Sequence, residues 1–151
     1  MNKNEKYMKQ AIKEAQKAEL IDEVPIGCVI VKDDRIIARG HNVRENKNSP
    51  IGHAEIEAIR KAAKKLNAWR LEDCDIYITL EPCIMCSGAI IQARMRSVYF
   101  GAYDPKGGAL GSSIDVTKAA NINHKIEIHG GILQEECAKL LTDYFRKKRD
   151  K

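Results

Sequence analysis

Long hydrophobic runs are absent from this chain of 151 residues. No stretch of about 18 consecutive apolar residues is present, so the sequence offers no candidate for a membrane-spanning helix. The first ten residues, MNKNEKYMKQ, are polar and charged, unlike the apolar region of a secretory signal. We therefore expect a soluble, cytoplasmic protein that does not interact with a membrane.

Aromatic residues are also scarce and make up 5% of the chain. Proteins that bind single-stranded RNA along an extended surface stack successive bases on several aromatic side chains. This chain has too few of them for such a platform. Any recognition of RNA would have to depend on a pocket for one extruded base and on backbone contacts.

Internal repeats, low-complexity stretches and proline-rich linkers are absent as well, and the length suits one ordinary domain. We therefore expect residues 1–151 to form a single domain. The chain has five cysteines, an odd number, and a domain of this size buries enough surface to fold without disulfides. In a reducing cytoplasm the cysteines need another role.

The net charge of +5 is distributed unevenly. Residues 146–151 include five basic residues and one acidic residue, so they carry +4 of this excess. Two interpretations remain open for this tail. The basic residues contact phosphates, or they form a solvated helix end that is favoured by the helix dipole.

The pattern of apolar residues predicts strands that alternate with helices. Helices are expected at residues 3–20, from His53 onward, at Cys83–Ala93 with Pro82 in the first turn, briefly in IDVTKAA, and in LQEECAKLLTDYFRKK. Strands are expected at Ile26–Val31 and Ile36–Ala38, which form a hairpin, and in DIYITL, SVYFG and KIEIH. GAYDPKGGALGS is expected to be a glycine-rich loop. This alternation indicates a layered α/β domain.

Two short motifs, His53-Ala54-Glu55 and Pro82-Cys83-Ile84-Met85-Cys86, carry the candidate chemistry. Cys83 and Cys86 are three residues apart, so their sulfurs share one face of a first helical turn, where the helix dipole favours thiolates. With His53 they offer a ligand set that suits tetrahedral Zn²⁺. Three protein ligands leave one position for water, which is typical of a catalytic zinc site. We expect one zinc ion per subunit.

Glu55 is the candidate proton carrier of this site. Two thiolates neutralise the charge of the ion and make it a weaker Lewis acid, so a nearby base becomes important. His53 and Glu55 are about 200° apart around a helix, and they can converge only at its end. The metal is therefore expected at the N-termini of both helices, where the Ala54 backbone N–H would point at a substrate.

Plainer interpretations remain for the same residues. Cys83 and Cys86 could be ordinary helix cysteines with His53 as a cap, and Glu55 could be a first-turn carboxylate that the helix dipole favours. A structural zinc would need a fourth ligand, for which the sequence offers His41, His124, His129 and Cys74. The other cysteines, Cys28, Cys74 and Cys137, are expected to be buried apolar fillers.

An activated water and a carboxylate that first takes and later returns a proton suit the hydrolytic removal of an amine from an amidine-like ring carbon. The amine leaves as ammonia. The pattern H-x-E followed by P-C-x-x-C is the signature of zinc-dependent nucleobase deaminases.

Along nearly its whole length, the sequence resembles the bacterial tRNA-specific adenosine deaminases. Besides HAE and EPCIMCSGAI, the resemblance rests on EVPIGCVIV, His41-Asn42, WRLEDCDIYITLEPC, FGAYDPKGGALGS, Asn123-His124 and YFRKKR, in the order of the family. It implies a three-layer α/β/α, cytidine-deaminase-like fold with a central mixed five-stranded sheet. It also implies a homodimer that hydrolyses adenosine to inosine at the wobble position of a tRNA anticodon.

The resemblance further implies a role for individual residues. It assigns zinc to His53, Cys83 and Cys86, and proton transfer to Glu55. It suggests that Asn42 holds the target nucleotide and that Asp104 and Lys106 lie near the flanking RNA of the anticodon loop.

Local roles compete with these assignments. Asn42 could instead cap a turn, and Asp104 beside Pro105 could serve a turn of its own. Gly52 and Ser87 are small departures from the family, where alanine is expected in many members. Neither departure removes a ligand, although Gly52 could loosen the entry to the site.

Two other functions fit the motifs. A deaminase of a free nucleobase or nucleoside, of the guanine or cytosine type, would share every metal-binding and proton-transfer residue. A non-catalytic zinc module that binds RNA would instead have a saturated metal site and no role for Glu55. The basic tail and the FGAYDPKGG segment favour an RNA substrate. The HAE and PCIMC motifs do not distinguish a tRNA deaminase from a deaminase of free nucleobases or nucleosides.

Overall fold

The computed structural model describes residues 1–119 and 124–150, and these residues form a mixed five-stranded sheet. The strands are β1 (Gly27–Lys32), β2 (Arg35–His41), β3 (Cys74–Leu80), β4 (Ser97–Ala102) and β5 (Glu127–His129). Their order in the sheet is β2-β1-β3-β4-β5. β1 pairs antiparallel with β2 and β3, whereas β3, β4 and β5 are mutually parallel neighbours.

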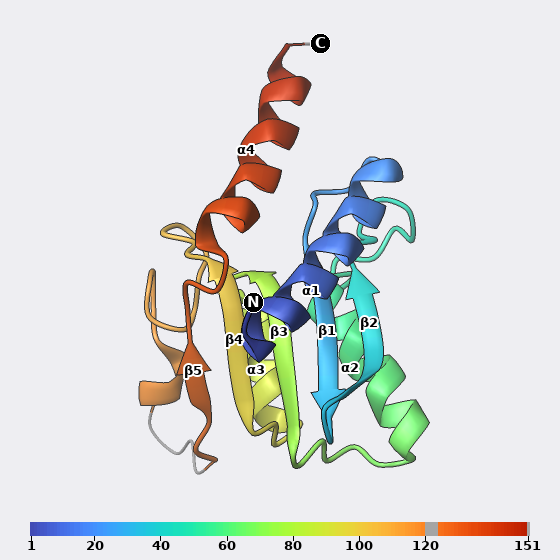
Figure 1. Cartoon of the computed structure of the whole chain (residues 1–151), viewed down its shortest axis with the longest axis vertical. Helices are drawn as coiled ribbons and strands as arrows, with labels where there is room; N and C mark the ends of the chain where they lie inside the picture. Colours follow the sequence, from blue (N-terminus) through green and yellow to red (C-terminus); the bar gives the residue numbers. More distant parts are fainter. Residues whose placement is uncertain (120–123, 151) are drawn as a thin grey trace.

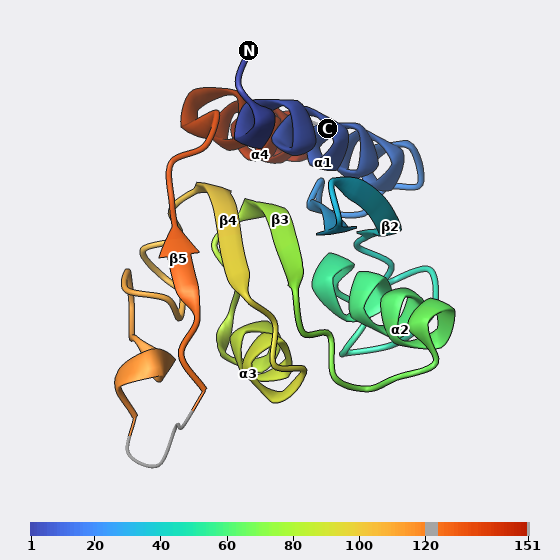
Figure 2. The same cartoon turned by 60° about the horizontal axis from the view of Figure 1, so that its bottom comes forward.

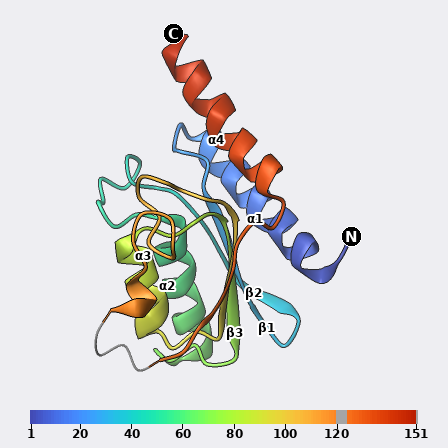
Figure 3. The same ribbon diagram turned by 90° about the vertical axis from the view of Figure 1, so that its left-hand side faces the viewer.

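Helices cover both faces of this sheet. They are α1 (Lys3–Leu20), α2 (Ala54–Leu66), α3 (Ile84–Gln92) and α4 (Gln134–Arg149), with a short 3-10 helix, η1 (Val116–Lys118). Figures 2 and 3 show α1 and α4 on one face and α2 and α3 on the other. The three-layer α/β/α arrangement expected from the sequence is therefore confirmed.

The core lies on both faces of the sheet, because successive strand residues point to opposite sides. Ile30, Ile78 and Phe100 are buried on the side of α2 and α3, and Val29 and Tyr77 are buried on the side of α1. Each such side chain stabilises the fold by about 1.5–3 kcal/mol relative to an exposed position. The three cysteines expected to be fillers are buried in these clusters: Cys28, Cys74 and Cys137.

Two glycines let helices approach the β1–β2 hairpin closely. A Cβ atom at Gly27 would lie 2.1 Å from the carbonyl oxygen of Ala11 in α1. A Cβ atom at Gly40 would lie 2.3 Å from the carbonyl oxygen of Ala54 in α2. Because Gly40 stands near the end of β2, this close approach holds the first turn of α2 against the sheet.

The structure corrects one helix boundary. Pro82 was expected in the first turn of a helix that includes Cys83, but α3 begins at Ile84 and Cys83 is its N-cap, with an extended backbone (φ −74°, ψ 178°). Pro82 thus precedes the cap, and its carbonyl accepts a hydrogen bond from the backbone N–H of Ala109. This bond requires an extended approach to the helix.

Helix α4 lies over β3 and β4. Its buried residues are Cys137 and Tyr144, and its C-terminal end extends past the sheet (Figure 1). We call residues 146–149 the basic end of α4. In the part of the chain described, no helix combines the length and the apolar character that crossing a membrane requires.

Candidate metal centre

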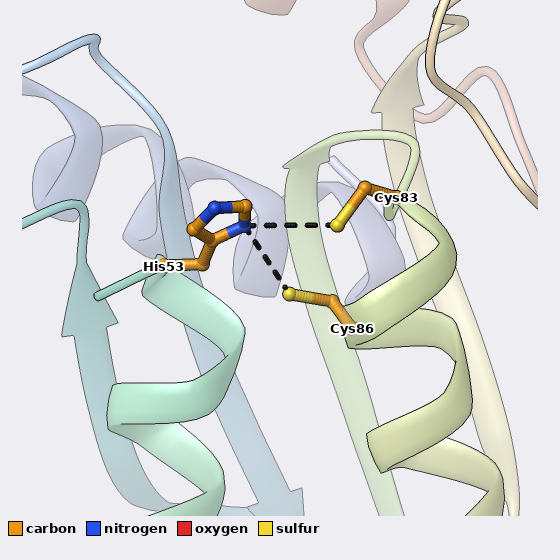
Figure 4. Close-up of side chains that lie close together, drawn as sticks. All are labelled: His53, Cys83 and Cys86. Carbon is orange, nitrogen blue, oxygen red and sulfur yellow. Dashed lines mark hydrogen bonds between the residues drawn. The ribbon is translucent and has the colours of Figure 1, made fainter. Parts of the chain in front are cut away.

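Two helix N-termini bring His53, Cys83 and Cys86 together. His53 is the N-cap of α2, Cys83 is the N-cap of α3, and Cys86 follows in the first turn of α3. In Figure 4 both sulfur atoms point toward Nδ1 of His53, at 3.7 Å from Cys83 and 3.5 Å from Cys86. The three candidate ligand atoms all lie within 4.8 Å of one another.

The spacing of these atoms fits a tetrahedral zinc ion. With Zn–N and Zn–S bonds of about 2.05 and 2.3 Å, a tetrahedral angle separates nitrogen from sulfur by about 3.6 Å. Both measured distances lie within about 0.1 Å of that value. One nitrogen and two sulfurs are also a donor set that Zn²⁺ prefers.

Within the described ranges, the candidate metal-binding group contains only these three residues. Nε2 of His124, which the sequence offers as a fourth ligand, donates a hydrogen bond to the Met95 carbonyl instead, at 2.6 Å. His129 stacks on Tyr99. The arrangement therefore resembles an open site with three protein ligands.

The charges of the cluster are coupled. A hydrogen bond from the Cys86 thiol lowers the pKa of Cys83 far below that of a free cysteine. The same bond, together with burial, raises the pKa of Cys86. Hydrogen bonding to Cys83 raises the pKa of His53. These hydrogen bonds thus favour one thiolate, and a cation would be needed to stabilise a second.

Glu55 lies beside the cluster in the first turn of α2, and only 4% of it is exposed. Burial is the largest cause that raises the pKa of this carboxyl group, and the negative charge of Cys83 also raises it. A backbone hydrogen bond, the charge of His53 and a hydrogen bond with Cys86 lower it, and the net pKa is about 7. A carboxyl group with a pKa near neutrality can both take up and release a proton.

Asn42 and Ala54 are joined by a hydrogen bond. The Ala54 N–H donates to Oδ1 of Asn42 at 3.0 Å, so the buried Asn42 side chain binds the first turn of α2. The N–H that we expect to face a substrate therefore already has a partner. Direct contact between this N–H and a substrate requires the hydrogen bond to open.

Asp104 forms a turn of its own, which is the local role that the sequence left open. Its Oδ1 accepts hydrogen bonds from the backbone N–H groups of Lys106 and Gly107, each at 3.1 Å. Lys106 is exposed. Contact of Asp104 and Lys106 with a substrate stays a prediction.

Two buried carboxylates that hold neighbouring loops were missed by sequence reasoning. Glu23 accepts hydrogen bonds from the backbone N–H groups of Glu45 and Asn46, in the loop that follows Asn42. Glu81 precedes Pro82 and binds residues of the loop that contains Asp104. The available signal was an acidic residue in each of two otherwise apolar segments, EVPIG and ITLEP.

The basic end of α4 borders a cavity of about 540 Å³ that also reaches Asn42. Part of its charge is paired, because Lys147 lies 3.8 Å from Glu19 and Lys148 lies 2.5 Å from Asp22. The residues that line the cavity are Ile21, Asp22, Glu23, Val24, Asn42, Arg44, Glu45, Asn46, Tyr144 and Lys148. Lys151 of the tail and Asn123 of the Asn123-His124 motif lie outside the described residues.

Comparison with known sequences identifies related deaminases. A family profile for MafB19-like deaminases matches residues 1–149. A tRNA-specific adenosine deaminase of Bacillus subtilis strain 168 is 49% identical over 151 residues, which cover 100% of this chain and 94% of the relative. A tRNA-specific adenosine deaminase of Haemophilus influenzae is 43% identical over 148 residues, which cover 97% of this chain and 86% of the relative.

Solved structures share the fold. One, from work on A-to-I editing by tRNA:A34 deaminases at the wobble position of transfer RNA, matches with a TM-score of 0.86 and 44% identity over 89% of this chain and 97% of that chain. A guanine deaminase from Nitrosomonas europaea matches with a TM-score of 0.79 and 25% identity over 93% of this chain and 83% of that chain. The deaminase fold expected from the sequence is thereby confirmed.

Proposed function

We propose, from the premise that the chain belongs to the MafB19-like deaminase family, that it hydrolyses adenosine to inosine at the wobble position of a tRNA anticodon. The observation that carries the substrate is the 49% identity, over the whole chain, with a tRNA-specific adenosine deaminase. The match to the structure from work on tRNA:A34 deaminases supports the same substrate. The chain is accordingly an enzyme of the hydrolase class.

We propose zinc as the cofactor, one ion per subunit, held by His53, Cys83 and Cys86. The support is the match between the measured distances of 3.7 and 3.5 Å and tetrahedral geometry. When bound, zinc would supply a Lewis acid that makes water a nucleophile near neutral pH. The chain contributes the side chains around it.

Glu55 moves the protons. Its buried carboxylate accepts a proton from the attacking water and delivers it to the adenine ring, whose C6 gains the oxygen. The second proton of that water goes to the amino group, which leaves as ammonia. The reaction consumes adenosine and water and yields inosine and ammonia. A pKa of about 7 allows Glu55 to serve in both directions.

The target nucleotide is held beside the metal cluster. Asn42 contributes a buried side-chain amide beside the N-terminus of α2, and its Oδ1 accepts the hydrogen bond from the Ala54 N–H. Asp104 and Lys106 belong to a loop that is docked on Pro82 through the Ala109 N–H. Pro82 lies two residues before the first residue of α3, Ile84. In this arrangement the two loop residues contact the RNA that flanks the extruded base.

Helix α3 supports the proposal of a homodimer. Its sequence IMCSGAIIQ contains no charged residue, yet Ile84 is 63% exposed. A Cβ atom at Gly88 would meet nothing within 4 Å, so the same helix has an open surface there. A helix that is apolar all round is normally buried, and a second copy of the chain would cover it. We further propose one domain over residues 1–151 and a cytoplasmic location.

A comparison of substrates tests the function. The zinc-loaded protein is incubated separately with tRNA, adenosine, guanine and cytidine, and inosine in tRNA and free ammonia are measured. We expect inosine at the wobble position and turnover of the free compounds that is slower by at least about a hundredfold, because they lack the flanking contacts. Activity on the free compounds alone would reject the tRNA substrate.

Deamination of free guanine is the second candidate. The Nitrosomonas europaea guanine deaminase shares the fold at 25% identity, which is the observation that favours it. The stronger match over 97% of the structure from the tRNA:A34 work favours RNA. Mapping of inosine in cellular tRNA after depletion of this protein would identify the substrate in the cell.

A further inference from the structure

A carboxylate without a basic partner is buried at the end of β3. Glu81 is 2% exposed and directly precedes Pro82 and Cys83. Among the ion pairs of the described residues, none includes Glu81. A buried carboxylate is costly unless hydrogen bonds compensate the lost hydration, so its partners identify what it holds.

Among the described residues, the hydrogen-bond partners of the Glu81 side chain all lie on one loop. Oε1 accepts hydrogen bonds from the Asp104 N–H at 3.1 Å and from the Ser112 hydroxyl group. Oε2 accepts from the N–H groups of Leu110 and Ser112, each at 3.1 Å. We call this set of four hydrogen bonds the Glu81 clamp. It joins both ends of the segment 104–112 to a single carboxylate.

The loop also lies directly against the clamp. A Cβ atom at Gly108 would lie 2.4 Å from Cδ of Glu81 and 2.6 Å from the carbonyl oxygen of Asp104. Only a glycine fits at this point. The Ala109 N–H donates to the Pro82 carbonyl at 2.9 Å. The loop is therefore docked on the two residues that precede Cys83.

The outer part of the loop has a defined shape but is open to solvent. The turn formed by Asp104 fixes the backbone of Lys106 and Gly107, whereas the Lys106 side chain is exposed. Thus the inner side of the loop is tied to the segment of Cys83, and its outer side is free to meet a ligand.

We propose that Glu81 is a positioning residue, whose clamp holds Asp104 and Lys106 at a fixed place beside the metal cluster so that tRNA binds there. The inference rests on the proposed function, because it takes tRNA as the ligand of this loop. Glu81 touches neither the cluster nor the substrate. Its clamp therefore acts on the binding of tRNA and leaves the chemical step unchanged.

The sharpest test compares two neighbouring serines in the zinc-loaded protein. Ser112→Ala removes the hydroxyl donor of the clamp, whereas Ser113→Ala changes an exposed side chain outside it. We expect Ser112→Ala to raise KM for an anticodon stem-loop about tenfold, since hydrogen bonds to charged groups are strong, with kcat within about twofold. Ser113→Ala should match the native protein, and Ser112→Thr, which keeps the hydroxyl, should restore KM.

Two further variants test the clamp from its other members. Glu81→Gln turns an amide N–H group toward backbone N–H donors, so we expect an increase in KM larger than that of Ser112→Ala. Gly108→Ala pushes the loop away while every donor remains, and it should also raise KM. Gly108 is distant in sequence from the cluster, so Gly108→Ala still tests the Glu81 clamp if Glu81→Gln does not fold.

The outcomes separate the clamp from the proposed function. Raised KM with unchanged kcat and one zinc per chain supports the clamp. A loss of zinc, a loss of kcat at unchanged KM, or equal behaviour of Ser112→Ala and Ser113→Ala would overturn it while the native reaction stands. Absence of inosine in the reaction of the native protein with tRNA would instead reject the proposed function, and the clamp with it.

Discussion

The metal cluster and the basic end of α4 are two candidate functional regions that the fold treats in opposite ways. The cluster is formed by two helix N-termini on the sheet, and its side chains come within 4.8 Å of one another. The basic end extends past the sheet, and its charges are exposed or paired with acidic residues of α1 and the following turn. The cluster is defined by the positions of its side chains, whereas the basic end is defined only by its excess of basic residues.

The two regions differ in how precisely a sequence signal predicts the positions of side chains. Motif spacing predicts where the ligand atoms lie, because short side chains at a helix N-terminus have few possible orientations. An excess of basic residues does not predict where their charged groups lie, since solvated ammonium and guanidinium groups can pair with whichever carboxylate is near. Experiments should therefore affect the cluster in an all-or-none manner and the basic end gradually.

The largest effect is expected from Cys83→Ala, because Cys83 belongs to the geometrically fixed cluster. Loss of one thiolate from a three-ligand site should abolish zinc binding and lower deamination by at least about a thousandfold. Zinc content per chain and ammonia release measure the two effects.

Cys74→Ala is the matched control for this substitution. Cys74 is buried in the core at the start of β3 and belongs to no metal-binding group among the described residues. It should keep one zinc per chain at a small cost in stability. Zinc content that remains unchanged in Cys83→Ala would reject the ligand assignment.

Glu55→Gln should separate the metal from the chemistry within the same region. The amide preserves the shape of the side chain but cannot take up and release a proton near neutral pH, so zinc and fold should remain while kcat falls about 10²- to 10⁴-fold. Single-turnover ammonia release and zinc content are the measurements. Glu57→Gln, two residues along α2, removes a buried carboxylate that pairs with Lys47 and Arg60. Equal losses in the two variants would exclude a special role for Glu55.

The sequence allowed the fold to be predicted because its segments are locally consistent. The helix expected at residues 3–20 coincides with α1, whose Asn2 forms a capping box with Glu5. The hairpin was predicted from its turn, although a bulge between Ile30 and Val31 shifts the register in a way that no local pattern encodes. Boundaries failed where a contact distant in sequence decides them, as with the Ala109 N–H on the Pro82 carbonyl.

The candidate site divides in the same way. His53, Glu55, Cys83 and Cys86 were identified because their chemistry is specified within two short motifs. The bond between Asn42 and Ala54 joins residues 12 positions apart, and the bonds of Glu81 reach 23 to 31 positions along the chain. Such contacts depend on the tertiary fold, so composition and periodicity could not reveal them.

The basic end should show a graded effect on RNA binding. Deletion of residues 146–151 should weaken the binding of tRNA and flatten its salt dependence, because each lost phosphate contact reduces the slope of log K against log salt by about 0.7–0.9. Binding titrations at several salt concentrations measure this slope.

Two point variants sharpen this prediction. Lys148 is already paired with Asp22, whereas Arg149 has no ion-pair partner among the residues that the structure describes. Arg149→Ala should therefore flatten the slope more than Lys148→Ala. An unchanged slope after the deletion would show that the basic end is only a solvated helix terminus.

The smallest expected effect concerns the link between α4 and the turn after α1. The Tyr144 hydroxyl donates to the Asp22 carbonyl at 3.3 Å, so Tyr144→Phe should lower the free energy of unfolding by about 0.5–1.5 kcal/mol. The apolar ring stays in place, and zinc content and kcat should remain unchanged because the hydroxyl group contacts none of the three cluster residues. Chemical denaturation measures the stability difference. A loss of zinc in this variant would mean that the two regions are coupled, and the contrast between a geometrically fixed cluster and an independent basic end would no longer hold.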